Sequence, residues 1–136
     1  MSPTLVDAGP LVALLDRRDS HHAACREALR HLPAPLMTVW PALTEAMYLL
    51  ATSWPAQRQL LGWLTSGALR LLSLDDVDVP RIRELMAKYR DLPMDLADAA
   101  LVRAAERDRI TQIFTIDRRD FSLYRPARLG RFRIVP

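Results

Sequence analysis

Short apolar runs alternate along the chain with longer segments of helical periodicity, and this alternation constrains the fold more than any other feature. We expect strands in five apolar runs, residues 4–7, 36–40, 69–74, 111–116 and 131–135. Helices of ten or more residues are expected between most of them. This arrangement is typical of a parallel sheet with helices on both faces. The sequence therefore predicts an α/β protein with a three-layer α/β/α fold and a mainly parallel central sheet.

The helical segments have recognisable starts, because Asp, Ser and Pro are common at the first positions of helices. We expect helices at residues 10–15, from Asp19 or Ser20 to about 31, from Pro41 to about 52, from about 55 to 67 after Ser53, from Asp78 and Pro80 to 89, and from Asp95 to about 108, with a turn or short helix at 118–124. The helix after Pro41 is apolar on most sides, which predicts that it is buried.

The chain has 136 residues, half of them apolar, so we expect a single domain over residues 1–136 with a proper core. Its one cysteine, Cys25, excludes an internal disulfide and any site with several thiolates, and we expect it in the core. The N-terminus has no basic region before its apolar run and meets Asp7 early, which is untypical of a signal peptide or a membrane span. A cytoplasmic protein without a membrane segment is expected.

Positive charge gathers at the C-terminal end of the chain. Residues 118–136 hold six arginines and one acid, whereas the other 117 residues carry a net charge of −2. Eighteen of the 19 basic residues are arginine. Either a coding bias toward arginine explains this, or the guanidinium groups contact phosphate, which their planar forks do well. An anionic body with a cationic tail fits a protein that holds metal ions near a nucleic acid, without requiring it.

Two predicted strands end in aspartate, at Asp7 and at Asp117. In open α/β sheets, sites lie beyond the carboxyl ends of the strands, so these acids are candidates for chemistry. Each also precedes a predicted helix, where aspartate is a common cap. For either residue alone, the two interpretations are about equally good.

The helices contribute three more candidate acids. Glu45 lies in a largely apolar helix, and no lysine or arginine occurs between residues 32 and 57 to pair with it locally, which favours a metal ion or a distant arginine as its partner. Asp95 and Asp98 are three residues apart and share a helix face. Asp95 is expected to cap this helix, and Asp98 lies at the rim of its apolar face.

If these acids converge, their repulsion must be relieved. Hard divalent cations do this, and ligands that are all oxygen favour magnesium or manganese. A pair of such ions activates water and stabilises the leaving oxygen in phosphodiester hydrolysis. The chain has no phosphate-binding glycine loop, nucleophile elbow or HExxH zinc motif. Haloacid-dehalogenase-type hydrolases and receiver domains are disfavoured because position 9, where both need an acid, is Gly9.

Four segments, in order, resemble the PIN-domain nucleases, and within them the VapC-type toxins of type II toxin–antitoxin pairs. These segments are VDAGPLVALLDRRDSHH with Asp7, LTEAMYLL with Glu45, MDLADAALVRAAE with Asp98, and FTIDRRDF with Asp117. Each motif alone is short, but four of them in this order cover nearly the whole chain.

The resemblance implies an endoribonuclease that depends on Mg²⁺ or Mn²⁺, an RNA substrate, an antitoxin partner and a homodimer. It makes Asp7, Glu45, Asp98 and Asp117 the catalytic metal ligands and Asp95 an additional acid. Thr115 is implied as a supporting hydroxyl, and the basic pair Arg118 and Arg119 as contacts to RNA phosphate. Asp120 is left outside the ligand set.

Two alternatives stay open at this point. Related nucleases process RNA without an antitoxin, and a non-catalytic interaction module would use the same acids only as helix caps. The segment with Trp54, Leu61 and Trp63 forms either a protein contact or, as is more common for such residues, part of the core.

Overall fold

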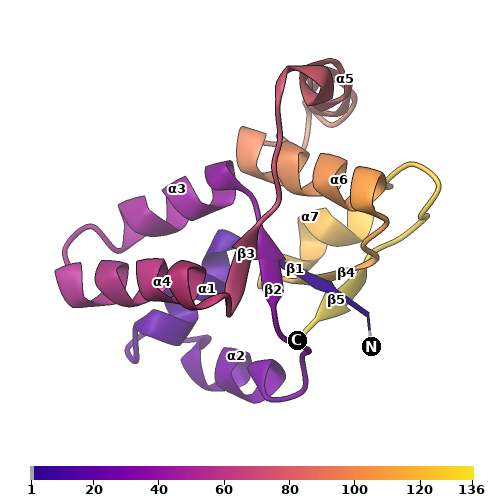
Figure 1. The fold of residues 1–136 in the computed structure, drawn as a ribbon. Coiled ribbons are helices and arrows are strands. Elements are labelled where there is room, and N and C mark those ends of the chain that lie inside the picture. The colour runs from indigo at the N-terminus through magenta and orange to yellow at the C-terminus, as the bar shows by residue number, and fades with distance from the viewer. Residues whose placement is uncertain (1) are drawn as a thin grey trace.

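A five-stranded sheet runs through the centre of the molecule in the computed structural model, which describes residues 2–136 (Figure 1). Its strands are β1 (Thr4–Val6), β2 (Leu36–Thr38), β3 (Leu69–Leu71), β4 (Gln112–Phe114) and β5 (Arg133–Val135). All neighbouring strands are parallel, in the order β3-β2-β1-β4-β5. The chain order reverses between β1 and β4, which is where open α/β sheets place their sites. The predicted parallel α/β/α fold is confirmed.

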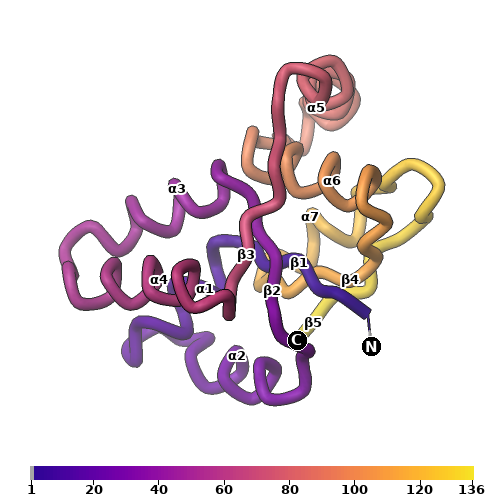
Figure 2. Tube along the Cα trace, viewed as in Figure 1, coloured from indigo at the N-terminus to yellow at the C-terminus, as the bar shows by residue number. Residues whose placement is uncertain are grey.

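Helices cover both faces of this sheet. They are α1 (Ala8–Leu15), α2 (His22–Leu29), α3 (Trp40–Leu49), α4 (Trp54–Ser66), α5 (Val79–Lys88), α6 (Leu96–Asp108) and α7 (Arg118–Leu123), with a 3₁₀ turn, η1 (Asp76–Asp78), before α5. One core joins α1, α2 and α4 to the sheet, and the other joins α6 and α7 to its opposite face. Helix α3 packs against both α1 and α6, and α5 lies outside α6, away from the sheet (Figure 2).

Helix α6 packs on the central sheet, and each of its two ends is defined by a particular residue. It presents seven buried residues, five of them alanine, so its backbone packs closely over the sheet. Asp95 caps its N-terminus by accepting a hydrogen bond from the Asp98 N–H at 2.8 Å. Its C-terminus ends at Arg109, whose backbone is left-handed. Asp95 therefore begins the helix as predicted.

Helix boundaries differ from the sequence prediction where a cap was misplaced. Helix α1 begins at Ala8, two residues earlier than predicted, because Asp7 caps it and ends β1. Helix α2 begins at His22 without a side-chain cap, so the predicted capping by Asp19 or Ser20 is wrong. The Asp19 carboxylate instead accepts a hydrogen bond from the His21 N–H in the preceding turn.

Two further expectations about burial need correction. Helix α3 is not buried on most sides, since Tyr48 is 78% exposed and Trp40 is 62% exposed. Asp78 does not cap α5 with its side chain; it is buried and pairs with arginines of α6. Cys25 is fully buried, as predicted. In the segment of uncertain role, Trp54 is 62% exposed and Trp63 packs on the core.

Among residues 2–136, no helix combines the length and the apolar composition that crossing a membrane requires.

Candidate metal centre

The carboxyl ends of β1 and β4 bring Asp7 and Asp117 to the same edge of the sheet. Asp7 is only 8% exposed and caps α1 by accepting a hydrogen bond from the Ala8 N–H at 2.8 Å. The buried Thr115 hydroxyl donates to the other Asp7 oxygen at 3.0 Å and accepts from the Asp117 N–H at 3.0 Å. One hydroxyl therefore links the two strand ends and fixes the Asp7 carboxylate.

Gly9 lets helix α1 lie close to the end of β4. A Cβ atom at this position would lie 2.7 Å from Cγ1 of Ile116, which is closer than real contacts allow. Because Asp7 precedes α1 and Asp117 follows Ile116, this close packing keeps the two acids near one another.

The N-termini of α6 and α7 supply the next carboxylates. One oxygen from each of Asp98, Asp117 and Asp120 lies within 4.8 Å of the other two. Asp117 also caps α7, accepting a hydrogen bond from the Asp120 N–H at 3.2 Å. The Tyr124 hydroxyl donates to Asp98 at 2.7 Å and so orients that side chain. The predicted helix caps at Asp7, Asp95 and Asp117 are thus present, and the same residues lie in the acidic group.

Glu45 reaches this group from α3. It is exposed, and together with Asp95 it lines an open cavity of about 610 Å³. Partial burial raises the pKa of Glu45, and the negative charges of Asp7 and Asp95 raise it further. The six acids Asp7, Glu45, Asp95, Asp98, Asp117 and Asp120, named here the acidic cluster, therefore interact with one another from four elements.

The electrostatics of the acidic cluster are unfavourable for ionised carboxylates. Burial raises the pKa of Asp98 to about 8, and the negative charges of Asp7 and Asp95 add to the shift. Burial likewise raises the pKa of Asp7, despite its two hydrogen bonds. The pKa of Asp120 is raised by burial and by the charge of Asp117. Within residues 2–136, no arginine, lysine or histidine forms an ion pair with any member of the cluster.

A divalent cation is the charge that this arrangement fits. The donors are all carboxylate oxygens, which suit Mg²⁺ and Mn²⁺ better than softer metals. Each oxygen that already accepts one hydrogen bond keeps a second lone pair for a metal. A cation would also remove the repulsion that raises these pKa values.

Two residues near the site were not in the predicted ligand set. Asp120 lies with Asp98 and Asp117 and is absent from the predicted set. Its spacing of three residues from Asp117 at a helix start repeats that of Asp95 and Asp98, and this spacing is a signal in the sequence that points to it. Tyr124 reaches Asp98 across the fold, and no local pattern in the sequence marks this contact.

The predicted basic pair follows Asp117 directly at the start of α7. Arg118 donates a hydrogen bond to the carbonyl of Pro136, so its guanidinium is held against the end of the chain. Arg119 is exposed, and its positive charge lowers the pKa of Asp120, although burial and Asp117 outweigh it.

Comparisons with known proteins agree with this geometry. The PIN domain family model matches residues 4–128. The chain is 33% identical over 134 residues to Ribonuclease VapC26 of Mycobacterium tuberculosis, an alignment that covers 97% of this chain and 99% of that protein.

Solved structures share the fold at lower identity. Mycobacterium tuberculosis VapC20, described as a sarcin–ricin loop cleaving toxin, superposes with a TM-score of 0.78 at 17% identity, over 85% of this chain and 91% of that one. A chain of a toxin–antitoxin complex from Klebsiella pneumoniae superposes with a TM-score of 0.72 at 17% identity, over 98% and 96% of the two chains. From the family match and the similarity to VapC26, the chain belongs to the PIN domain family.

Proposed function

We propose that residues 1–136 act as a single nuclease domain, a metal-dependent endoribonuclease that is the toxin of a type II toxin–antitoxin pair. The observation that carries this proposal is the acidic cluster, in which carboxylate oxygens of Asp98, Asp117 and Asp120 lie within 4.8 Å of one another and the other three acids interact with these or with one another through their charges. No member forms an ion pair with an arginine, lysine or histidine among residues 2–136. Membership of the PIN domain family and similarity to Ribonuclease VapC26 support the same activity. RNA in the cytoplasm is the proposed substrate.

In this proposal the protein's residues have separate tasks. Asp7, Glu45, Asp98 and Asp117 would hold Mg²⁺ or Mn²⁺, with Asp95 and Asp120 beside them. When bound, such ions activate water and stabilise the leaving oxygen of a phosphodiester. Thr115 fixes the Asp7 carboxylate, and Tyr124 fixes that of Asp98. Arg118 and Arg119, at the start of α7, would contact RNA phosphate through the N–H groups that they do not use within the protein.

The substitution Asp7→Asn tests the activity. It preserves the shape of the side chain but removes the charge that a cation would need, so we expect cleavage of a labelled RNA in Mn²⁺ to be abolished. The thermal midpoint without metal should be unchanged or higher, because burial disfavours the charged form of Asp7. The matched control is Asp91→Asn, an exposed acid outside the cluster that should cleave like the wild type. Undiminished cleavage by folded Asp7→Asn protein would reject the assignment.

An antitoxin is the proposed protein partner. A groove of about 200 Å³, lined almost wholly by apolar side chains such as Leu11, Leu32 and Trp63, lies between the ends of α2 and α4. An apolar helix or strand of an antitoxin would fit such a surface. Co-purification with the product of a neighbouring small reading frame, lost on substituting Leu32→Glu, would support this. Cleavage without any such partner would instead favour an RNA-processing nuclease.

A homodimer is proposed from the exposed apolar side chains around the cavity that holds Glu45. Trp40 and Tyr48 of α3 and Leu96 of α6 are all more than half exposed and line this cavity. Contiguous apolar surface of this kind is typical of interfaces. Light scattering should give twice the chain mass, and Tyr48→Glu should give the monomer mass; a monomeric wild type would contradict the proposal.

A further inference from the structure

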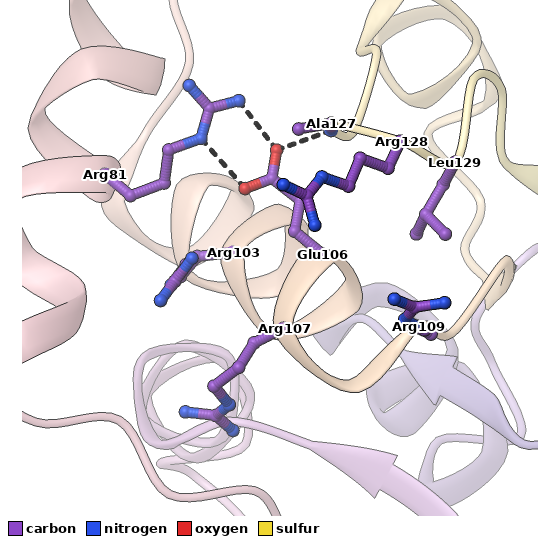
Figure 3. Close-up of a pocket in the computed structure, with 8 residues that line it drawn as sticks. All are labelled: Arg81, Arg103, Glu106, Arg107, Arg109, Ala127, Arg128 and Leu129. Atoms are coloured by element: carbon purple, nitrogen blue, oxygen red, sulfur yellow. Dashed lines mark hydrogen bonds and ion pairs between the residues drawn. The ribbon is translucent and has the colours of Figure 1, made fainter.

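Five arginine side chains line one cavity at the far end of α6 from the acidic cluster (Figure 3). The cavity has a volume of about 590 Å³ and is lined by Arg81 of α5, Arg103 and Arg107 of α6, and Arg109 and Arg128 of the following loops, with Glu106 as its one acid. Arginine makes up 18 of the 136 residues, so eight lining positions would carry about one arginine if these were spread evenly. The coding bias toward arginine therefore does not account for the concentration.

Two of these five guanidinium groups have no partner among the described residues, and a third is only partly used. Arg81 makes two hydrogen bonds to Glu106 and one to Glu84, so all three of its nitrogens have a protein partner. Arg103 uses only its Nε, on Asp78. Within residues 2–136, neither Arg109 nor Arg128 makes a side-chain hydrogen bond or an ion pair. The guanidinium groups of Arg109 and Arg128, and the two terminal nitrogens of Arg103, are therefore free to bind a ligand.

The backbone at these two unpaired residues is unusual. Arg109 has φ 56° and Arg128 has φ 68°, and among residues 2–136 they are the only residues other than glycine with positive φ. The remaining two such positions are occupied by Gly67 and Gly130, which adopt this conformation without strain. Arg109 has this conformation as the residue that ends α6, and at both positions arginine is less favourable than glycine or asparagine.

The loop that carries Arg128 is tied to the cavity wall. Glu106 accepts a hydrogen bond from the Ala127 N–H at 2.7 Å while it binds Arg81 (Figure 3). The one acid in the cavity is therefore occupied in fixing the loop, and the unpaired arginines remain available to a ligand. The backbone of the loop that carries Arg128 is thus held in place before any ligand binds.

We propose that this arginine cavity binds backbone phosphates of the RNA, several nucleotides from the bond that is cut, an inference that rests on the proposed function. Guanidinium forks bind phosphate through two parallel hydrogen bonds, and arrays of them track a nucleic-acid backbone. Helix α6 runs from Asp98 to Arg109, about 16 Å at ~1.5 Å per residue. The loop of Arg128 follows Tyr124, which contacts Asp98.

The length of α6 between the two sites is within the reach of one RNA strand. At ~3.4 Å per phosphate in a stacked strand, roughly five nucleotides cover the length of α6. An acidic peptide also pairs with arginine, but this shared helix and loop connect the cavity to the acidic cluster and so favour RNA.

The test removes the two unpaired guanidinium groups without disturbing the backbone. Asparagine tolerates positive φ, so R109N/R128N should melt at or above the wild-type temperature. The control R17N/R18N removes the same charge from an exposed turn between α1 and α2. The affinity for a fluorescent single-stranded RNA of about 12 nucleotides is measured by anisotropy in EDTA, over a range of salt concentrations that gives the salt slope.

We expect R109N/R128N to bind this RNA about tenfold more weakly and to lower the salt slope by roughly 1.4, since each phosphate contact to a single strand contributes about 0.7. The control should change neither by a comparable amount. Equal losses in both variants, or none, would overturn the proposal. Loss of binding to a poly-aspartate peptide with unchanged RNA binding would overturn it in favour of an acidic protein partner.

Because binding is measured without metal, this test is separate from that of the nuclease activity. Arginine-dependent RNA binding by a protein that cuts no RNA would support the cavity and reject the nuclease. If the protein cuts RNA but its RNA binding is unchanged in R109N/R128N, the nuclease proposal is supported and the arginine cavity is rejected as an RNA site.

Discussion

Helix α6 connects two groups of carboxylates with opposite electrostatic surroundings. Toward its C-terminus, Asp78 lies against Arg103 at 2.8 Å and Arg107 at 3.3 Å, and Glu106 binds Arg81 at 2.7 Å. Burial alone would raise the pKa of Asp78, but hydrogen bonds from the Asp75 N–H and Arg103 lower it below its usual value. At the N-terminus of α6, the acidic cluster has no such partners, and burial raises its pKa values.

This difference separates acids that stabilise the fold from acids that do not. Three of the 18 arginines pair with Asp78 and Glu106, and none forms an ion pair with Asp7 or Asp98. The raised pKa values of Asp7 and Asp98 mean that ionising the acidic cluster is unfavourable in the metal-free protein, which is typical of groups that serve a function. A cation bound from outside the chain would balance the charge of the ionised cluster.

The largest expected effect is a loss of stability when a carboxylate that is paired with arginine, Asp78, is substituted. Asp78→Asn leaves Arg103 and Arg107 without their buried partner, so we expect the free energy of unfolding to fall by about 3 kcal/mol. Urea unfolding measures this, with Asp76→Asn, an exposed acid of the same turn, as the control. A loss below about 1 kcal/mol would mean that these ion pairs contribute no more than surface pairs do.

A metal ion should stabilise the folded protein through the acidic cluster and not through the carboxylates that are paired with arginine. Mn²⁺ at about 100 times its dissociation constant should add about 2.7 kcal/mol to the free energy of unfolding. Asp98→Asn should lose most of this gain, whereas Asp78→Asn, although less stable, should keep it. Thermal melts in Mn²⁺ and in EDTA check both. Identical melts of the wild type under the two conditions would show that the acidic cluster binds no metal.

The acidic cluster and the carboxylates paired with arginine should also change the free energy of unfolding over different pH ranges. A carboxyl whose pKa is higher in the folded protein favours folding while protonated, and that contribution is lost as the pH rises through the folded pKa. With the pKa of Asp98 at about 8, metal-free stability should fall between about pH 4 and pH 8, by at most ~1.4 kcal/mol per pH unit, and then level off. Asp78 and Glu106 have lowered pKa values, so their contribution is lost only at acid pH.

Asp98→Asn isolates this effect. Urea unfolding in EDTA at about pH 5 and about pH 9 should show a smaller difference for this variant than for the wild type. An unchanged difference would assign the pH dependence to other members of the acidic cluster.

Much of the fold follows from local patterns in the sequence. The alternation of apolar runs and helices, with caps such as Asp95 and Ser53, was sufficient to predict the parallel sheet and most helices. Predictions were wrong where tertiary contacts override local preference. Asp78 has the pattern of a helix cap, yet its arginine partners are 25 and 29 residues away in the sequence. Tyr48 lies in a helix predicted to be buried and Trp40 in a predicted strand, yet Trp40 begins α3 and the packing of this helix leaves both side chains exposed.

The candidate site was predictable to the extent that it lies on strand ends and helix starts. Asp7, Asp98 and Asp117 occupy such positions, and the sheet order then brings them together. Their roles as metal ligands remain predictions. The link from Tyr124 to Asp98 depends on how α7 packs on α6, which no pattern in the sequence records. The arginine cavity likewise depends on residues that only the tertiary structure brings together.

The smallest expected effect comes from removing one hydroxyl group from either of two tyrosines, Tyr124 and Tyr89, whose rings pack edge to face. Tyr124 donates to Asp98, whereas Tyr89 accepts a hydrogen bond from the Arg125 N–H at 2.9 Å. Tyr124→Phe and Tyr89→Phe each remove one hydroxyl, so each should cost about 1 kcal/mol in metal-free unfolding.

Only Tyr124→Phe should change the behaviour of the acidic cluster. The lost hydrogen bond had lowered the pKa of Asp98, so its removal raises that pKa further and extends the pH-dependent loss of stability to higher pH. Because the carboxylate also loses its orientation, Mn²⁺ affinity should fall about tenfold. Calorimetric titration with Mn²⁺ and unfolding at several pH values measure both effects. If Tyr89→Phe changed them equally, the hydroxyl of Tyr124 would have only a packing role, and the cluster would not depend on how Asp98 is oriented.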